Sequence, residues 1–178
     1  MWLQPLSPYA ASKLGAEGFV SAYSSTYGLK TTLLRFFNVF GPWQRHDHEY
    51  AAVLPKWIWK ALNGQSIELH GDGTQTRDFT YVKTVCDVIE SAINNKVYGP
   101  EVINLAYGNN ISLNEVISKL RNIFPNIEVI NSPTRIGDVK NSQNLPNRLK
   151  SKFPDVVPIA FDTAFNETIN WLIKQAEK

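Results

Sequence analysis

Residues 7–13 read Ser-Pro-Tyr-Ala-Ala-Ser-Lys and place the phenol of Tyr9 four positions before the ammonium of Lys13. Ser7 is a suitable N-cap and Pro8 a suitable first residue, so the stretch predicts the start of a helix. Because side chains four apart on a helix are neighbours, we expect Lys13 and the helix dipole to stabilise a Tyr9 phenolate. Such a pair can act as a base, although the same spacing also occurs among ordinary surface residues.

Working outward from this stretch, the chain alternates predicted helices and strands. Helices are expected over residues 8–27, 55–63, 85–93, 113–123 and 162–174, and strands over residues 31–36, 67–70, 102–106 and 127–130. The first helix is expected to be amphipathic, and residues 38–42 are expected to form a loop at the carboxyl end of a strand. This alternation predicts an α/β fold with at least partly parallel strand pairing.

Composition excludes several classes of protein. The chain has 178 residues, 43% of them hydrophobic, and a net charge of +2 without a basic cluster, which predicts a folded domain or lobe and no nucleic-acid partner. Cys86 is the only cysteine, which excludes an internal disulfide and a cysteine zinc site, and it is expected to be buried. No apolar run is long enough to span a membrane, so we expect a soluble, cytoplasmic protein.

The sequence contains no glycine-rich dinucleotide fingerprint. Gly71-Asp72-Gly73 lacks a third glycine and the strand and helix that surround such a motif, so it is interpreted as a turn. A Tyr-Lys pair without a dinucleotide cradle predicts that the N-terminal nucleotide-binding half of a Rossmann unit is absent from this chain.

Four motifs occur in a fixed order at residues 5–13, 34–42, 71–79 and 135–139. Together they make the chain resemble the C-terminal portion of the extended short-chain dehydrogenase/reductases, the NAD-dependent nucleotide-sugar epimerases and dehydratases. The resemblance is greatest to UDP-glucose and UDP-N-acetylhexosamine 4-epimerases. It implies that residues 1–40 supply the last helix and strand of the Rossmann half. Residues 41–178 would form mainly the smaller substrate-binding lobe, with residues 81–106 returning to the Rossmann sheet.

The resemblance also implies roles for individual residues. Tyr9 would be the acid/base at the sugar 4-hydroxyl, Lys13 would bind the nicotinamide ribose of NAD, and Phe36 would touch the nicotinamide. The residues implied to bind the UDP-sugar are Asn38, Ala52, Val53, Glu68, Leu69, His70, Arg77, Arg135 and Asp138. Of these, Asn38, Arg77 and Arg135 would bind the diphosphate, Asp138 a ribose hydroxyl, and the strand Glu68–His70 would border uracil.

Several alternatives stay open at this point. Phe36 could be a core residue, Asn38 a turn former, and Arg135 with Asp138 a surface ion pair. His46 and His48 lie in a polar segment that we interpret as a hydrophilic loop rather than a metal site. The whole chain could belong to a dehydratase or decarboxylase, or be a non-catalytic nucleotide-sugar-binding or oligomerisation remnant. The family implies homodimerisation through the helix at residues 8–27.

Two further expectations concern this chain in particular. Without a nucleotide-binding half, it is expected to be inactive alone. Residues 142–145 read Ser-Gln-Asn-Leu where the family more usually has Ser-x-Ala-Asp, which puts the contacts of the following helix in doubt.

Overall fold

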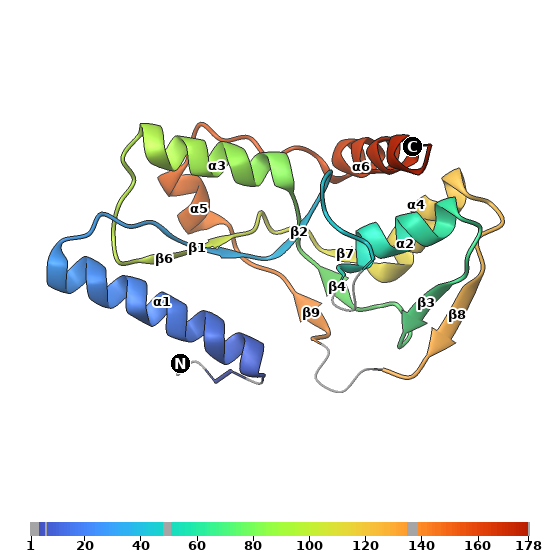
Figure 1. Ribbon diagram of the computed structural model, residues 1–178, viewed down its shortest axis with the longest axis horizontal. Helices are drawn as coiled ribbons and strands as arrows, with labels where there is room; N and C mark the ends of the chain where they lie inside the picture. The colour runs from blue at the N-terminus through green and yellow to red at the C-terminus, as the bar shows by residue number, and fades with distance from the viewer. Residues whose placement is uncertain (1–3, 6, 48–50, 135–138, 178) are drawn as a thin grey trace.

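The structure is a computed structural model that describes residues 4–5, 7–47, 51–134 and 139–177 (Figure 1). It confirms the α/β class predicted from the sequence. The elements in chain order are α1 (Pro8–Tyr27), β1 (Leu33–Phe36), β2 (Asn38–Phe40), α2 (Val53–Leu62), β3 (Ile67–His70), β4 (Thr76–Arg77), β5 (Phe79–Tyr81), α3 (Val82–Asn94), β6 (Val102–Leu105), β7 (Ile111–Ser112), α4 (Leu113–Ile123), β8 (Val129–Ser132), β9 (Asn141–Ser142), α5 (Asn147–Lys152) and α6 (Phe161–Ala176).

Parallel pairing dominates the sheets, as predicted. β1 pairs with β6, β2 with β5 and β3 with β8, each in parallel, and Leu33 lies opposite Val102 in the first pair. β4 is the centre of a small mixed sheet, antiparallel to β7 and parallel to β9. Parallel strands need long connections, and here the helices α2 and α3 lie within these connections.

A large hydrophobic core holds the lobe built from α2, α4, α6, β3 and β5, on the right of Figure 1. Its fully buried side chains include Ile58 of α2, Ile67 of β3 and Val116 of α4. Phe165 and Leu172 of α6 cover the same core, at 2% and 1% exposure. This lobe therefore has the helix-on-sheet packing that gives a small domain most of its stability.

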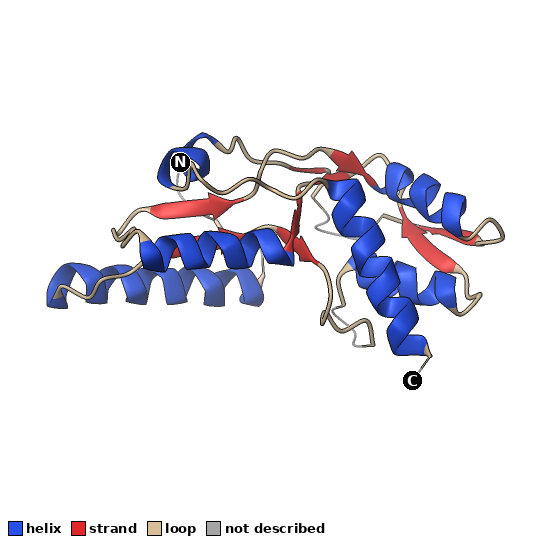
Figure 2. Cartoon of the chain, turned by 90° about the horizontal axis from the view of Figure 1, so that it is seen from above, coloured by secondary structure: helices blue, strands red, loops and turns tan. Residues whose placement is uncertain are grey.

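A second hydrophobic core joins α3 and α5 to β6. Ile103 and Leu105 are two residues apart on β6, so their side chains point to one face, where they meet Val88 of α3 and Phe153 beside α5. Figure 2 shows α3 and α6 from above, with the strands beneath them. The division of the chain into a Rossmann part and a substrate lobe stays a prediction, although β6 does return to pair with β1.

α1 differs from the other long helices because it buries none of its side chains. Phe19 and Tyr27 are 71% and 74% exposed. The amphipathic face predicted for this helix is therefore not covered by the described part of the chain. None of the described helices is long and apolar enough to cross a bilayer.

Three local predictions are wrong. Asn38–Phe40 is a strand rather than a loop, because β5 supplies a parallel partner for it. Cys86 is exposed on α3, whose buried stripe passes through Val85, Val88 and Ala92. Val129–Ser132 forms β8 two residues later than expected.

Gly41 ends β2 with a φ of 146°, and a Cβ there would lie 2.5 Å from Val82 Cγ1. Only glycine therefore lets this turn approach the start of α3 so closely.

Candidate functional site

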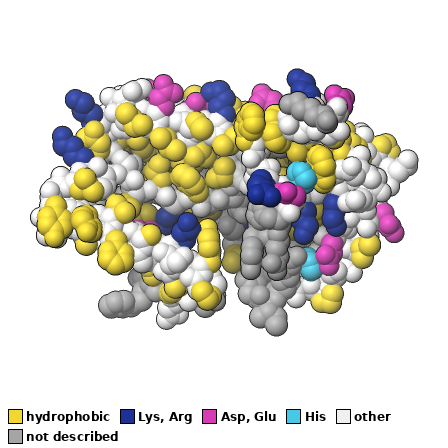
Figure 3. All heavy atoms as spheres, viewed as in Figure 1, with side chains coloured by type: hydrophobic (Ala, Val, Ile, Leu, Met, Phe, Trp, Pro, Cys, Tyr) yellow, Lys and Arg dark blue, Asp and Glu magenta, His cyan; other side chains and the backbone are white. Residues whose placement is uncertain are grey.

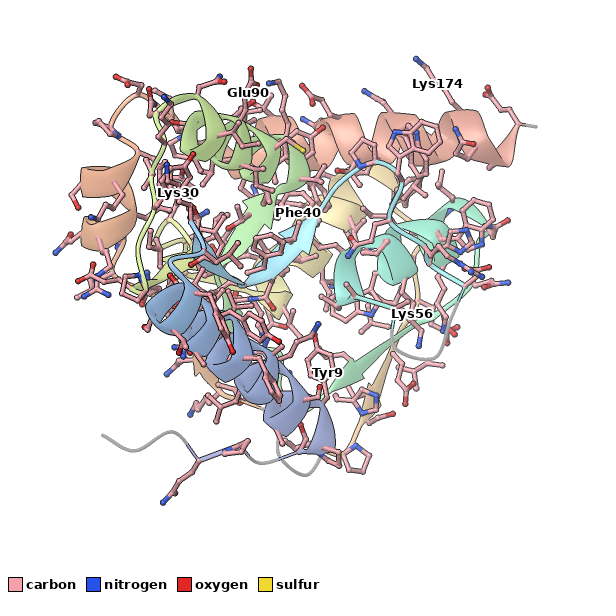
Figure 4. The ribbon with its side chains drawn as sticks, turned by 60° about the vertical axis from the view of Figure 1, so that its left-hand side comes forward. Tyr9, Lys30, Phe40, Lys56, Glu90 and Lys174 are labelled. Atoms are coloured by element: carbon pink, nitrogen blue, oxygen red, sulfur yellow. The ribbon has the colours of Figure 1, made fainter. Side chains whose placement is uncertain are left out.

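A groove of about 780 Å³ runs between α1 and β1. Tyr9, Lys13 and Glu17 line it from α1, and Arg35 and Phe36 line it from β1. Lys13 Nζ lies 5.4 Å from the centroid of the Tyr9 ring. Figure 4 shows Tyr9 at the N-terminal end of α1. The two groups predicted to do chemistry thus share one helical face and one groove.

The start of α1 is built as the sequence predicts. Ser7 is the N-cap, and its Oγ accepts a hydrogen bond from the Ala10 N–H at 3.1 Å. Pro8 occupies the first helical position. Tyr9 therefore lies in the first turn, where the positive end of the helix dipole favours a negative charge.

Glu17 and Arg35 tie α1 to β1. Arg35 Nε donates to Glu17 Oε2 at 2.7 Å and Arg35 Nη2 donates to Oε1 at 2.6 Å, which is a bidentate ion pair. Within the described part of α1, no other side chain makes a hydrogen bond or ion pair outside the helix and its N-cap. The sequence analysis missed this pair, since nothing in the spacing joins residues 17 and 35.

Phe36 and Asn38 lie at the carboxyl end of β1 and the start of β2. Phe36 is 54% exposed and lines the groove, so it is not a core residue. Asn38 belongs to a strand rather than a turn, and its Nδ2 donates to the carbonyl of Asp78 at 3.2 Å. Both positions are compatible with ligand contact at a strand end.

Arg77 lies half-buried in β4. Its Nη1 donates to the carbonyls of Thr76 at 2.9 Å and Val139 at 2.6 Å, which fixes the guanidinium beside the segment that follows residues 135–138. Arg135 and Asp138 themselves lie outside the described residues. Their implied partnership with Arg77 on a diphosphate therefore stays a prediction.

Asp78, which the sequence analysis did not single out, is fully buried at 0% exposure. Its carboxylate accepts hydrogen bonds from the main-chain N–H groups of Tyr107, Gly108, Asn109 and Asn144. Burial raises the pKa of Asp78, and these four N–H donors oppose that rise. A carboxylate directly before the buried strand β5 was the signal that could have revealed it.

The strand predicted to border uracil presents Glu68 and His70 on one side. Ser132 Oγ donates to Glu68 Oε1 at 2.7 Å. The His70 ring lies 3.2 Å from the Pro133 carbonyl and 3.4 Å from the same Glu68 oxygen. Leu69 is 4% exposed and belongs to the large core, so only its main chain could contact a ligand.

Ala52 and Val53 begin α2, Ala52 exposed as the N-cap and Val53 partly buried against the large core. In the segment before them, the His46 ring stacks on Trp59 with 3.9 Å between centroids. Arg45 pairs with Asp47 and lowers the pKa of that carboxyl to about 2. His48 lies outside the described residues. Elsewhere in the described chain, no cluster of three His, Cys, Asp or Glu side chains could hold a metal ion.

The chain matches the NAD dependent epimerase/dehydratase family over residues 2–106. It is 36% identical over 172 residues to the UDP-glucuronate 4-epimerase of Thermodesulfobacterium geofontis, covering 94% of this chain and 50% of that protein. It is 31% identical to the UDP-N-acetyl-alpha-D-glucosaminuronate decarboxylase of Bacillus cytotoxicus, covering 92% of this chain and 49% of that one.

Among solved structures, the UDP-N-acetylglucosamine 4-epimerase from Methanobrevibacter ruminantium M1, in complex with UDP-N-acetylmuramic acid, superposes with a TM-score of 0.88 at 36% identity. The match covers 97% of this chain and 56% of that one. The chain therefore spans about half the length of the relatives that it matches.

Proposed function

The chain belongs to the NAD-dependent epimerase/dehydratase family, and from this membership we propose that it is the substrate-binding, Tyr/Lys-bearing portion of a UDP-hexose 4-epimerase. The observation that carries the proposal is the shared groove, which Tyr9 and Lys13 line from α1 and Phe36 lines from β1. The groove thus brings together a potential base, Tyr9, a cation that could stabilise it, Lys13, and an aromatic ring, Phe36. A sugar and a nicotinamide could meet there.

In this proposal, Tyr9 removes the proton from the sugar 4-hydroxyl and later returns a proton to the same oxygen from its phenol. Bound NAD would supply the hydride acceptor and donor for the sugar C4, with Lys13 and Phe36 as the residues that would hold its nicotinamide end. Lys13 favours the phenolate and donates hydrogen bonds to the nicotinamide ribose. Tyr9 lines the groove and is 72% exposed, which leaves room for a sugar ring to turn over beside it.

The residues present fit only one end of NAD. Lys13 and Phe36 suit the nicotinamide ribose and ring, but the sequence holds no glycine-rich cradle for the pyrophosphate. We therefore propose that this chain alone binds NAD weakly and does not turn over substrate. Activity would require a nucleotide-binding unit seated against it.

The unpaired edge of β1 is where we propose that such a unit binds. Among the described strands, β1 pairs only with β6, so its other edge presents free main-chain groups. Figure 3 shows hydrophobic side chains gathered over β1, between α3 and α1. Ile89 and Ile93 of α3 are 39% and 67% exposed, and Phe36 is 54% exposed. A parallel strand with its helix would cover these side chains.

Homodimerisation through α1 is a further part of the proposal. Phe19 is 71% exposed, and a Cβ added at Gly15 or Gly18 would meet nothing within 4 Å, so another helix could approach this face closely. Sedimentation should detect a dimer that Phe19→Asp dissociates. A monomer at high concentration of the wild type would contradict it.

The nucleotide contacts can be tested on the chain by itself. Titration calorimetry should detect UDP binding and little or no NAD binding. Arg77→Ala should weaken UDP at least about tenfold, because a charge-assisted contact to phosphate is lost. Arg121→Ala, an exposed arginine on α4, is the matched control and should leave the affinity unchanged. Equal affinities for the two variants would reject the role of Arg77.

Decarboxylation is a second candidate because one relative is a uronate decarboxylase. Both reactions begin with oxidation at C4 by NAD, but a decarboxylase then releases carbon dioxide from C6. UDP-glucuronate labelled at the carboxyl carbon would separate them in an assembly that includes a nucleotide-binding unit. An epimerase retains the label in the sugar, whereas a decarboxylase loses it.

A further inference from the structure

Asp78 is a buried carboxylate with no cationic partner among the residues that the structure describes. It lies between β4 and β5 at 0% exposure, and no Lys, Arg or His in the described ranges forms an ion pair with it. A buried charge is strongly unfavourable unless hydrogen bonds replace its lost hydration. The main chain of two distant segments supplies those bonds.

Three of the donors are consecutive. Oδ1 accepts from the N–H groups of Tyr107 at 3.3 Å and Asn109 at 3.2 Å, and Oδ2 accepts from Gly108 at 2.8 Å. Successive N–H groups that converge in this way form an anion-binding nest. The anion in this nest is a side chain of the protein itself. Asn144, after β9, adds a fourth, longer bond to Oδ2 at 3.4 Å.

Gly108 allows the nest to form. Its φ is 86°, a conformation that favours glycine, and a Cβ there would lie 3.2 Å from the Asn144 carbonyl oxygen. The loop after β6 and the segment after β9 therefore meet at Gly108, directly against the Asp78 carboxylate.

The main chain of Asp78 also makes hydrogen bonds, to Asn38 of β2 and to Ser142 of β9. Its carbonyl accepts from the Asn38 N–H at 3.3 Å and from Asn38 Nδ2 at 3.2 Å, and its N–H donates to Ser142 O at 2.8 Å. Arg77 is its neighbour in β4 and lies opposite Ser142 in the sheet. The separation of Asn38 and Arg77 is thus set through Asp78.

We propose that Asp78 is a positioning residue of the phosphate pocket, whose carboxylate locks the loop at residues 107–109 and the segment at residue 144 so that Asn38 and Arg77 stay at a fixed spacing. The inference rests on the proposed function for the identity of the ligand. The geometry of Asn38 and Arg77 can be measured without any ligand.

The ligand-free test is nuclear magnetic resonance of the wild type and of Asp78→Asn. The variant keeps the shape of the side chain but replaces an acceptor by an N–H₂ donor that opposes the nest. Signals of the Asn38 side-chain amide and of Arg77 should shift, while signals of α4 in the large core stay in place. Asp155→Asn, at an exposed carboxylate that makes no hydrogen bond to the nest, is the control and should shift neither. Unchanged Asn38 and Arg77 signals in Asp78→Asn would overturn the inference.

The second measurement compares UDP with uridine. Asp78→Asn should lower UDP affinity about tenfold and leave uridine affinity nearly unchanged, because only the phosphate contacts move. A purely structural role would lower both affinities equally, and that result would also overturn the inference. If the wild type binds no UDP, the proposed function fails while the resonance test still decides the role of Asp78.

Gly108→Ala provides an independent variant should Asp78→Asn not fold. It disturbs the donors and leaves the carboxylate intact. The same shifts at Asn38 and Arg77 are expected. A folded Gly108→Ala protein with wild-type signals at both residues would contradict the proposal.

Discussion

The lobe around α2, α4 and α6 and the helix α1 are held in opposite ways. The lobe encloses a hydrophobic core, and its strand β3 carries Glu68, Leu69 and His70, three of the residues proposed to bind the nucleotide sugar. α1 carries the residues proposed to do the chemistry, yet it buries no side chain and is tied to β1 by the Glu17–Arg35 pair. Residues Glu68–His70, proposed to contact substrate, are therefore positioned by core packing, whereas Tyr9 and Lys13 depend on one exposed helix.

This difference explains why α1 needs strong local signals. Most of the stability of a helix in a protein comes from the packing of one face, and α1 buries no side chain. α1 has a serine cap and a proline at its start, and Gly28 at its end in the left-handed conformation at φ 67°. These devices favour the helix before any partner covers it. Substitutions in α1 and in the lobe can measure how far the two regions differ.

Phe165→Ala and Phe19→Ala compare the same substitution in the two regions. Phe165 is 2% exposed in the large core, and its loss should lower the free energy of unfolding by about 3–5 kcal/mol. Phe19 is 71% exposed on α1 of a single chain, and at dilutions that keep the protein monomeric its loss should change that free energy by about 0.5 kcal/mol or less. Urea denaturation measures both. Equal effects would show that α1 packs as tightly as the lobe.

Tyr81→Phe tests the tie between β5 and α6. The Tyr81 hydroxyl donates to Glu167 Oε2 at 2.7 Å, and its removal should cost about 1–2 kcal/mol at neutral pH. Burial and then this hydrogen bond raise the pKa of Tyr81 from 10.0 to about 12. The folded protein therefore holds this proton more tightly than the unfolded chain.

The sign of the pH effect follows from that difference. The contribution of Tyr81 is complete below pH 10.0 and is lost as the pH rises through about 12. Denaturation at a series of alkaline pH values should show that the free energy of unfolding falls less with rising pH for Tyr81→Phe than for the wild type. A decline does remain in the variant, because burial also raises the pKa of Tyr107 to about 12. Equal declines would contradict the assignment.

Ser112→Ala and Ser7→Ala compare the N-caps of α4 and α1. Ser112 and Glu115 form a capping box, so Ser112→Ala should lower the free energy of unfolding by about 1 kcal/mol. Ser7→Ala should leave global unfolding nearly unchanged and instead reduce helix content, because α1 is not part of a core. Circular dichroism and urea denaturation separate the two outcomes.

The cap of α4 also predicts an acid effect. Hydrogen bonds from the Ser112 N–H and hydroxyl lower the pKa of Glu115 below its ordinary 4.5. The contribution of Glu115 to the free energy of unfolding is therefore complete above pH 4.5 and is lost as the pH falls through the lowered pKa of this carboxyl. Glu115→Gln should be less sensitive to acid than the wild type over that range.

Glu17→Ala and Arg35→Ala should lower the free energy of global unfolding by about 0.5–1 kcal/mol or less, since the pair is partly exposed to solvent. Their main effect should be faster hydrogen exchange of the α1 amides. The exchanged pair Glu17→Arg with Arg35→Glu should restore protection. If neither single variant changes α1, the ion pair does not hold this helix.

The sequence predicted elements where local chemistry decides the structure. The strand Ile67–His70 was predicted at its observed bounds because its alternation ends at the Gly71–Gly73 turn. The capping box likewise located the start of α4. The prediction failed where partners far apart in the sequence decide the structure. β2 forms because β5 lies beside it. α5 forms where Leu149 and Phe153 pack into the second core.

The candidate site divides in the same way. Tyr9 and Lys13 are related by helical spacing and were found from the sequence. Asp78 and the Glu17–Arg35 pair depend on segments far apart in the chain, so spacing could not reveal them. Cys86 was misplaced because a position one residue away from the buried stripe of a helix already faces solvent.

The three parallel pairs also affect how the chain reaches its native state. Residues 37–101 separate β1 from its partner β6, and residues 71–128 separate β3 from its partner β8. β2 likewise pairs with β5, which comes later in the chain. No hairpin can nucleate these ladders locally, so high contact order should make refolding slow. During synthesis, β1 leaves the ribosome long before its partner, with both edges open to other chains. The yield of folded protein should therefore depend more on the rate of synthesis and the supply of chaperones than on the free energy of unfolding of the native state.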